Sequence, residues 1–347
     1  MLEINDIIGD KIFIIAEAGV NHNGDIETAN KLIDEAVEAG VDAVKFQTFN
    51  TDKLVTKNAP KADYQNETTN QNESQYDMLK KLELSKNDHE ILIEYCKEKN
   101  IKFMSTPFDF ESVDLLEQLG VNFFKIGSGD LTNIPLLKYI AELNKPMIVS
   151  TGMANLGEVE EAVNSIKKSG NNQLILLHCV SNYPADFKNV NLKAMNTMKI
   201  AFNLEVGYSD HTSGIEAPVA AVAMGAKVIE KHFTLNKSMK GPDHKASLNP
   251  KELTEMVESI RNVERSIGDG VKKCTKNEFN TRKISRKSIT AKKNIKKGKK
   301  INENDICIKR PAKGIKPKYY DLLLSKAVTT KKINKDDGIY WKDIKII

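Results

Sequence analysis

The chain has few cysteines, and their positions exclude two classes of protein. Only four occur among 347 residues, and they are scattered as Cys96, Cys179, Cys274 and Cys307. No two of them form a CxxC pair, so neither a thiolate zinc site nor a disulfide scaffold is expected. Cys179 ends the apolar run LILLHC, and we interpret it as a small buried hydrophobic residue rather than a nucleophile.

Long apolar stretches are also missing. No run approaches the ~18 residues that a membrane span needs. The N-terminal stretch MLEINDIIGDKIFIIAEAG lacks the basic-then-apolar order of a signal peptide. We therefore expect a cytoplasmic protein that makes no membrane contact.

Several binding motifs are absent as well. No GxGxxG follows the first apolar run, which argues against a dinucleotide-binding fold. The chain has no RNP-like aromatic pattern, no zinc finger and no clear helix-turn-helix, so a nucleic-acid function would rest on basic charge alone. Residues 272–347 carry that charge, with 24 Lys/Arg against 7 Asp/Glu, whereas the rest of the chain has a net charge of −12. Such a basic segment also suits an anionic substrate, or docking onto an acidic surface like that of the first part of the chain.

What the first 268 residues do contain is a repeated pattern of strand and helix. Short apolar, β-branched runs occupy 13–17, 43–48, 103–108, 123–129, 147–152, 174–179, 204–211 and 228–233. Amphipathic helical stretches such as ETANKLIDEAVEAG lie between most of them. Continuous apolar runs suit parallel strands that are buried on both faces. Eight units in about 260 residues predict a (β/α)8 TIM barrel, with a doubly wound open sheet as the alternative.

The remaining segments predict the domain boundaries. We expect a barrel domain over 1–268, a linker over 269–283 and a small β-rich domain over 284–347, where Gly, Pro and Lys become frequent. The interval from 51 to 85 is long for a βα loop. We favour a loop that covers a substrate over a disordered insertion, because the interval leaves the C-terminal end of the second strand.

Polar side chains gather at the predicted C-terminal strand ends, where barrel enzymes place their active sites. They are Glu17, Lys45, Gln47, Ser105, Thr106, Lys125, Ser128, Ser150, His178, Ser209, His211, Glu230 and His232. A single lysine or serine there is usually a surface or capping residue. Their joint occurrence predicts an active site, and two lysines among hydroxyl groups predict a phosphate or carboxylate as its ligand.

Two histidines end adjacent predicted strands. His211 and His232 would lie about one strand spacing apart, or ~4.8 Å. Such a pair can share one divalent ion that keeps open positions for water and substrate. His178 is a less certain neighbour, and His22, in GVNHNG, is as well explained by a turn.

These residues belong to motifs that resemble one enzyme family. IAEAGVNHNGD, VKFQTF, KADYQ, STPFD, FKIGSGD, IVSTGMA, GYSDHT, EKHFTL and GPDHKASL occur in the order found in the sialic acid synthases. The segment RKSITAKKNIKKG…ICIKRPAKGI resembles their C-terminal antifreeze-like SAF domain, a β-clip. The resemblance covers almost the whole chain. It implies an enzyme that condenses phosphoenolpyruvate with an N-acetylmannosamine-type sugar and releases phosphate.

The resemblance also implies roles for individual residues. Phosphoenolpyruvate would be held by Lys45, Thr106, Lys125, Ser128, Ser150 and Ser209. His211 and His232 match the ligands of a divalent metal, Mn²⁺ or Mg²⁺, and Glu17 is the best candidate for a general acid and base. The sugar side would be formed by Gln47, Asn70, Asp130, Tyr183, Asp243 and Arg310. Arg310 matches an arginine that the C-terminal domain delivers into the barrel of the other subunit, which implies a domain-swapped homodimer.

Two questions stay open at this level. The sugar is either N-acetylmannosamine, giving N-acetylneuraminate, or its 2,4-diacetamido-6-deoxy analogue, giving N,N'-diacetyllegionaminate. The alternative reaction classes are a Schiff-base aldolase, with Lys125 as its candidate lysine, and a synthase of a 3-deoxy-sugar acid phosphate. An ice-binding role for the C-terminal domain is disfavoured by its many lysines.

Overall fold

The protein is described here from a computed structural model, which covers residue 4, residue 9 and residues 11–347. Residues 1–3, 5–8 and 10, which belong to the predicted barrel domain, lie outside the described residues. The chain divides into two compact units, 1–268 and 269–347.

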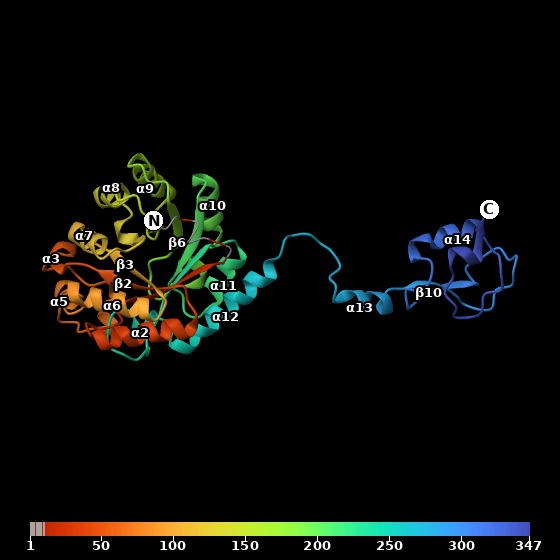
Figure 1. Cartoon of the computed structure of the whole chain (residues 1–347), viewed down its shortest axis with the longest axis horizontal. Coiled ribbons are helices and arrows are strands. Elements are labelled where there is room, and N and C mark those ends of the chain that lie inside the picture. Colours follow the sequence, from red (N-terminus) through yellow and green to blue (C-terminus); the bar gives the residue numbers. More distant parts are fainter. Residues whose placement is uncertain (1–3, 5–8, 10) are drawn as a thin grey trace. The chain divides into compact units, whose positions relative to one another are not determined.

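The first unit is a parallel barrel (Figure 1). Its strands are β1 (Phe13–Gly19), β2 (Ala43–Thr48), β3 (Lys102–Pro107), β4 (Phe124–Ile126), β5 (Met147–Ser150), β6 (Leu174–Cys179), β7 (Glu205–Asp210) and β8 (Val228–His232). They are ordered β3-β2-β1-β8-β7-β6-β5-β4, and β3 also lies against β4, so the sheet is a nearly closed barrel. The predicted fold is confirmed, and each strand falls on one of the eight predicted runs.

Helices surround this sheet. They are α2 (Ile26–Ala39), α6 (Lys86–Glu98), α7 (Phe110–Gln118), α8 (Ile134–Glu142), α9 (Leu156–Lys168), α10 (Lys193–Phe202), α11 (Glu216–Ala223) and α12 (Pro250–Ile267). Three short 3-10 turns lie in the loops of this unit, at η1 (Ser128–Asp130), η2 (Phe187–Asn189) and η3 (His244–Ala246). Side-chain caps fix where several helices begin; Asn155, for example, accepts hydrogen bonds from the first turn of α9.

The alternation of side chains along each strand sorts them into two cores. Ile14, Val44 and Ile229 point outward and pack with the helices. Ile15 and Val228 belong to a second, inner cluster that fills the barrel. Consecutive side chains of a strand face opposite sides of the sheet. Residues two or four positions after a residue of the inner cluster therefore also point into the barrel. This parity directs Glu17, Ser209 and Glu230 to the inside, at the C-terminal end of the barrel.

The interval between β2 and α6 forms helices, so the alternative expectation of a disordered insertion is wrong. It contains α3 (Thr51–Leu54), α4 (Asp63–Thr68) and α5 (Gln75–Lys80). Serine side chains cap α5 and α6, and Met78 and Gln65 are buried. The insertion is therefore a structured element that leaves the active-site end of the barrel.

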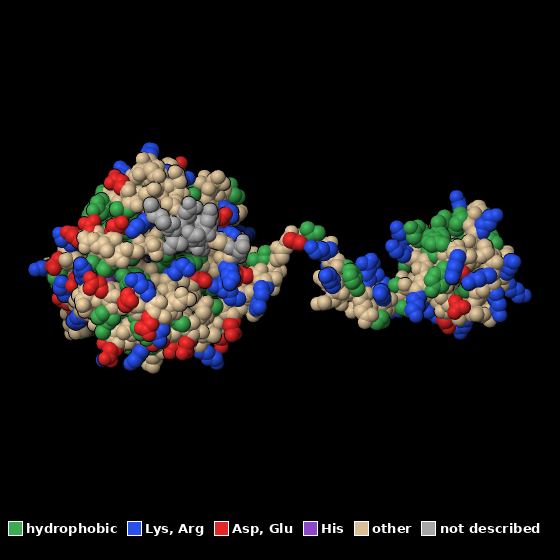
Figure 2. All heavy atoms as spheres, in the orientation of Figure 1, with side chains coloured by type: hydrophobic (Ala, Val, Ile, Leu, Met, Phe, Trp, Pro, Cys, Tyr) green, Lys and Arg blue, Asp and Glu red, His purple; other side chains and the backbone are tan. Residues whose placement is uncertain are grey.

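The second unit is small and rich in β-structure, as predicted. β9 (Ser288–Ala291) pairs antiparallel with β10 (Ile306–Lys309), and β11 (Ala327–Thr329) with β12 (Ile344–Ile346). The unit also contains α13 (Glu278–Ser285), α14 (Tyr320–Lys326), η4 (Pro317–Tyr319) and η5 (Trp341–Asp343). Isoleucines dominate its core. Helix α13 occupies 278–283 of the range predicted as a linker, and Figure 2 shows Lys and Arg side chains over much of this unit's visible surface.

Candidate active site

The charged residues at the C-terminal strand ends form one buried cluster. The Nζ of Lys45 lies 2.7 Å from Oε2 of Glu17 and 3.7 Å from Oε2 of Glu230. The Nζ of Lys125 lies 3.3 Å from Oε1 of Glu230. All four side chains are at most 7% exposed. The strand ends converge as predicted, because both lysines contact the same glutamate, Glu230. With two lysines and two glutamates, the cluster is close to electrically neutral.

The two carboxyl groups of the cluster titrate in opposite directions. Burial raises the pKa of Glu17 to about 7, against the opposing charge of Lys45 and with the help of Glu230. Burial also acts to raise the pKa of Glu230, but the charges of Lys125 and Lys45 outweigh it and lower that pKa to about 2. Glu230 is thus the fixed counter-ion of the lysines. Glu17 is the carboxyl group that can exchange a proton near neutral pH.

Hydroxyl groups complete an oxyanion-binding surface around the lysines. Lys45 donates a hydrogen bond to Oγ1 of Thr106 at 2.8 Å, and Lys125 donates one to Oγ of Ser150 at 2.8 Å. The hydroxyl of Ser209 donates to Glu230 at 2.8 Å. These predicted residues are therefore brought together. Their donors can turn to the oxygens of a carboxylate or phosphate.

A glycine loop lies beside these hydroxyls. The backbone N–H of Gly152 donates to Oγ of Ser128 at 2.9 Å. A Cβ atom on Gly152 would collide with the hydroxyls of both Ser128 and Ser181. Only glycine therefore allows the backbone to approach these two hydroxyls so closely. Ser181 was not predicted; its place in the loop after β6, with no other motif residue beside it, gave no separate signal.

The two predicted metal-ligating histidines lie side by side at the ends of the adjacent strands β7 and β8, with 52° between their ring planes. The ring centroids of His211 and His232 are 5.5 Å apart. Nδ1 of His211 lies 2.8 Å from the carbonyl oxygen of Val180, so the proton on Nδ1 is used there and Nε2 keeps a free lone pair. Nδ1 of His232 is buried and has no hydrogen-bond partner among the described residues.

These histidines fit a divalent ion with an incomplete protein shell. Within the described residues, no group of three or more His, Cys, Asp and Glu side chains has the geometry to hold a metal. A closed structural site is therefore not what the residues form. Two imidazoles with available nitrogens match an ion whose other ligands are water and substrate.

Aromatic rings cover the histidines. The ring of Tyr183 lies 4.1 Å from that of His211 and 5.7 Å from that of His232. Tyr64, from α4, stacks on Tyr183 with 5.0 Å between centroids. Tyr64 was not among the predicted site residues, although KADYQ was one of the motifs. Sequence alone does not show that α4 folds back onto the loop after β6.

The other predicted sugar-side residues differ in their positions. Gln47 donates to Oε1 of Glu17 at 3.2 Å, and Oδ2 of Asp243 lies 4.0 Å from Nδ1 of His232. Burial raises the pKa of Asp243 to about 6. Asp130 lies at the end of η1, beside Ser128, and accepts a hydrogen bond from Asn133 at 3.0 Å.

Within the part of the chain that the structure describes, two of the predicted sugar-side residues, Asn70 and Arg310, have no recorded contact with the buried cluster. Asn70 is exposed, and its Oδ1 accepts the backbone N–H of Asn72 at 3.1 Å in a local turn. Arg310 is an exposed residue of the second unit. Their predicted contacts with the sugar remain predictions.

The less certain histidines have structural roles. Nε2 of His178 lies 2.6 Å from the carbonyl oxygen of Val190, on the outer side of β6. Nδ1 of His22 accepts the N–H of Gly24 at 3.0 Å, as a turn residue does. Cys179 is buried as expected, but its Sγ also lies 3.7 Å from Nδ1 of His211, a contact that its apolar run did not indicate.

The fold and the site together define a class: a parallel barrel with two buried lysines set among hydroxyl groups at its C-terminal end, next to a pair of histidines. The NeuB family model matches residues 32–272, and the SAF domain model matches residues 286–345. The chain therefore belongs to the NeuB family.

Individual relatives agree with this assignment. The chain is 54% identical to the N,N'-diacetyllegionaminic acid synthase of Campylobacter jejuni, over 95% of this chain and 99% of the relative. It is 51% identical to the synthase of the same name from Legionella pneumophila, over 88% and 87% of the two chains. Among solved structures, the N-acetylneuraminic acid synthetase of Leptospira borgpetersenii superposes with a TM-score of 0.69 at 38% identity, covering 78% of this chain and 90% of that one.

Proposed function

We propose that the protein condenses phosphoenolpyruvate with 2,4-diacetamido-2,4,6-trideoxymannose to give N,N'-diacetyllegionaminate and phosphate. The observation that carries the reaction class is the pair of buried lysines, 45 and 125, set among hydroxyl groups beside two histidines. The choice of sugar is supported by the identities of 54% and 51% to N,N'-diacetyllegionaminic acid synthases, against 38% to the N-acetylneuraminic acid synthetase.

The anion site would hold phosphoenolpyruvate through the residues around the two lysines. Ammonium and hydroxyl donors come from Lys45, Lys125, Thr106, Ser150 and Ser209, and Ser128 accepts the backbone N–H of Gly152. Because Glu230 already balances much of the lysine charge, the hydroxyl groups and backbone add donors without adding net charge. The carboxylate and phosphate of one small substrate can then be held at two ends of the cluster.

The reaction forms one carbon–carbon bond and breaks one carbon–oxygen bond. C3 of phosphoenolpyruvate attacks the aldehyde carbon of the open-chain sugar, water adds to C2, and phosphate leaves with the C2–O electron pair. The aldehyde oxygen gains a proton, and the attacking water loses one. Glu17, with a pKa of about 7, is suited to accept that proton and return it. Its Oε1 lies against Gly19, as does Cε1 of His232, so the carboxyl group faces the histidine side.

His211 and His232 would hold the divalent ion, Mn²⁺ or Mg²⁺. When bound, the ion supplies Lewis-acid polarisation of the sugar's aldehyde oxygen. Gln47, Asp130, Tyr183 and Asp243 would contact the sugar. Asn70 joins them only if its side chain turns away from Asn72.

Arg310 would complete the sugar site from a second subunit. We propose a homodimer in which each C-terminal unit covers the barrel of its partner. The net charges of +17 on residues 272–347 and −12 on the rest are supporting observations, since opposite charges favour such docking.

Within the described residues, no helix has the length and apolarity to cross a membrane. All four cysteines are free thiols, in keeping with a cytoplasmic enzyme.

The test is phosphate release from phosphoenolpyruvate by purified, metal-stripped protein, with and without Mn²⁺. The sugars compared are 2,4-diacetamido-2,4,6-trideoxymannose, N-acetylmannosamine and N-acetylmannosamine 6-phosphate. Release that needs both the metal and the diacetamido sugar is expected. Release with N-acetylmannosamine alone would overturn the sugar assignment. No release with any sugar, together with borohydride trapping of pyruvate on Lys125, would replace the proposal with a Schiff-base aldolase.

A further inference from the structure

The active site lies under an aromatic cover. Glu17, Lys45 and Lys125 are only 2–3% exposed, and His232 is 8% exposed. Above the histidines, the rings of Tyr183 and Tyr64 lie in sequence, with 28° between their planes. Because Tyr183 lies against both histidines, a sugar bound beside them would lie close to its ring.

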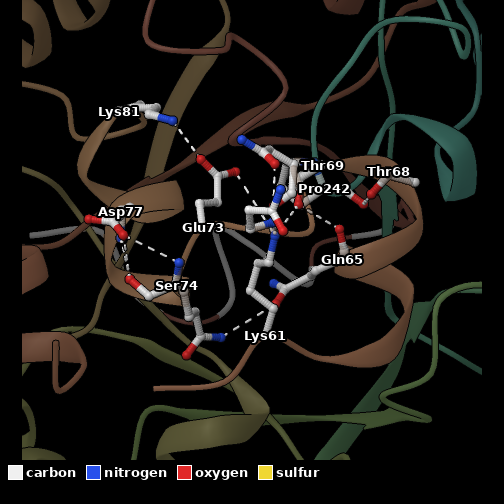
Figure 3. Close-up of polar contacts among 12 residues, drawn as sticks. Lys61, Gln65, Thr68, Thr69, Glu73, Ser74, Asp77, Lys81 and Pro242 are labelled. Carbon is white, nitrogen blue, oxygen red and sulfur yellow. Dashed lines mark hydrogen bonds and ion pairs between the residues drawn. The ribbon is translucent and has the colours of Figure 1, made fainter. Parts of the chain in front are cut away.

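The outer ring belongs to a closed loop, residues 59–75, which contains α4 and is called the α4 loop below. The backbone N–H of Gln75 donates to the carbonyl oxygen of Ala59 at 3.0 Å and closes its neck. Inside the neck, Lys61 donates to Oγ1 of Thr69 at 2.9 Å and to the carbonyl oxygen of Asn70 at 2.6 Å. Figure 3 shows this lysine between the two arms of the loop.

Lys61 is an unusual anchor because its side chain is only 1% exposed. Its charge is balanced by Glu73, whose Oε1 lies 4.0 Å away, and Glu73 also pairs with Lys81. Burying an ammonium group is costly unless it is hydrogen-bonded and paired. Lys61 therefore ties the residue before α4 to the residues after it, and this tie fixes where α4 and Tyr64 lie.

The α4 loop is also attached to the loop that carries Asp243. Oγ1 of Thr68 donates to the carbonyl oxygen of Pro242 at 3.4 Å, and Lys245 forms an ion pair with Glu67 at 3.2 Å. Tyr64 thus stacks on Tyr183 and belongs to a helix that contacts the residue before Asp243.

We propose that Tyr64 is a specificity-determining residue of the sugar site, held in position by Lys61 through the α4 loop. This inference rests on the proposed function, because Tyr183 and Asp243 are sugar-side residues only within it. The ring of Tyr64 offers an apolar surface next to the loop that carries the carboxyl group of Asp243. That combination suits a sugar with apolar substituents on a polar ring, such as an acetamido methyl group or a 6-deoxy methyl group.

The experiment measures sugar binding and turnover separately in matched variants. Tyr64→Ala removes the ring and Tyr64→Phe keeps it. Tyr76→Ala, on α5 of the same insertion, is the control because its hydroxyl binds Asp52 at the exposed side. For each protein, the Kd of 2,4-diacetamido-2,4,6-trideoxymannose is measured by calorimetry with phosphoenolpyruvate present and the metal removed. The KM values of both substrates follow from phosphate release.

In Tyr64→Ala, the Kd and KM of the sugar are expected to rise about tenfold, while the KM of phosphoenolpyruvate stays within about twofold. Tyr64→Phe and Tyr76→Ala should resemble the wild type. Lys61→Met should raise the KM of the sugar and speed hydrogen exchange across 59–75, whereas Lys57→Met, at an exposed lysine of the insertion, should do neither.

The outcomes separate this inference from the proposed function. If the wild type releases no phosphate but binds the sugar, and Tyr64→Ala weakens that binding, the proposed reaction fails and the role of Tyr64 stands. If the wild type turns over and Tyr64→Ala leaves the sugar's Kd and KM unchanged, the role of Tyr64 is overturned. A wild type that binds no sugar overturns both. Equal losses for the sugar and phosphoenolpyruvate in Tyr64→Ala would indicate a structural role only and would also overturn it.

Discussion

Glu17 and Glu230 share the ammonium group of Lys45, at 2.7 and 3.7 Å, yet they titrate on opposite sides of the ordinary glutamate pKa. The difference comes from the second lysine. Lys125 lies 3.3 Å from Glu230, so Glu230 is stabilised by two positive charges. Glu17 is paired with one lysine only, and the effect of burial on its pKa outweighs the charge of that lysine. The same arrangement thus provides a permanent anion and a proton-exchanging carboxyl group a few ångströms apart.

The affinity for phosphoenolpyruvate should weaken as the pH rises through about 7. Below this pH Glu17 is protonated, and the cluster has one more unit of positive charge for the anion; above it, ionised Glu17 repels the ligand. Calorimetric titration from about pH 6 to about pH 8.5 measures the trend. The ligand's own ionisation is common to all variants, so the wild type is compared with Glu17→Gln. An equal pH trend in that variant would contradict the assignment.

The stability of the barrel should respond oppositely to the two glutamates. The pKa of Glu17 in the folded protein, about 7, exceeds the ordinary glutamate value of 4.5, so its contribution to stability is complete below pH 4.5 and is lost as the pH rises to 7. For Glu230, at about 2, the contribution is present above 4.5 and is lost as the pH falls toward 2. At about pH 8, Glu17→Gln should raise the melting temperature by a few degrees and Glu230→Gln should lower it. Scanning calorimetry showing the same sign for both would refute this.

The sequence determines the barrel more directly than it determines the site. Strands that are buried on both faces need continuous apolar runs. Each of the eight predicted runs forms a strand, because few other arrangements bury both sides of such a run. The inward direction of Glu230 and the outward direction of Lys231 follow from the same alternation, and Lys231 pairs with buried Asp210 outside the barrel. The lysines and hydroxyls at the strand ends could therefore be predicted from position alone.

The contacts made by loops could not be predicted in this way. The stacking of Tyr64 on Tyr183 depends on how α4 folds back over about 120 residues of chain separation, and no local pattern encodes that. The sequence likewise placed Asn70 near the sugar only by resemblance, whereas its side chain forms a local turn with Asn72. The opposite pKa shifts of Glu17 and Glu230 needed the distances to Lys45 and Lys125.

Replacing Gly152 with alanine should selectively impair phosphoenolpyruvate binding. The new Cβ would collide with the hydroxyls of Ser128 and Ser181 and would push away Ser128, which accepts the Gly152 N–H. We expect the KM of phosphoenolpyruvate to rise at least about tenfold, with the KM of the sugar little changed. Gly129→Ala is the matched control, since a Cβ there meets nothing within 4 Å. Equal effects of both substitutions in steady-state kinetics would rule out an anion-binding role for this loop.

Removing either histidine of the pair should weaken metal binding. His211→Ala and His232→Ala are expected to weaken Mn²⁺ binding by at least about tenfold, because two imidazoles are the only protein nitrogens that we assign to the ion. Electron paramagnetic resonance of free Mn²⁺ measures this without turnover. His178→Gln is the control, as this ring binds the carbonyl of Val190 on the outer side of β6. Unchanged Mn²⁺ affinity in both alanine variants would mean that the ion binds elsewhere or not at all.

The proposed exchange of C-terminal units predicts that two inactive variants complement each other. A His232→Ala protein lacks a working barrel, and an Arg310→Ala protein lacks the arginine that the partner should deliver. After co-refolding, half of the dimers would be mixed, and each mixed dimer would contain one site with an intact barrel and an intact arginine. Roughly a quarter of wild-type activity should therefore return. If each chain instead used its own Arg310, every site in the mixed dimer would carry one defect, and no activity would return. Phosphate release measured before and after co-refolding, with each variant refolded alone as the control, decides between the two arrangements.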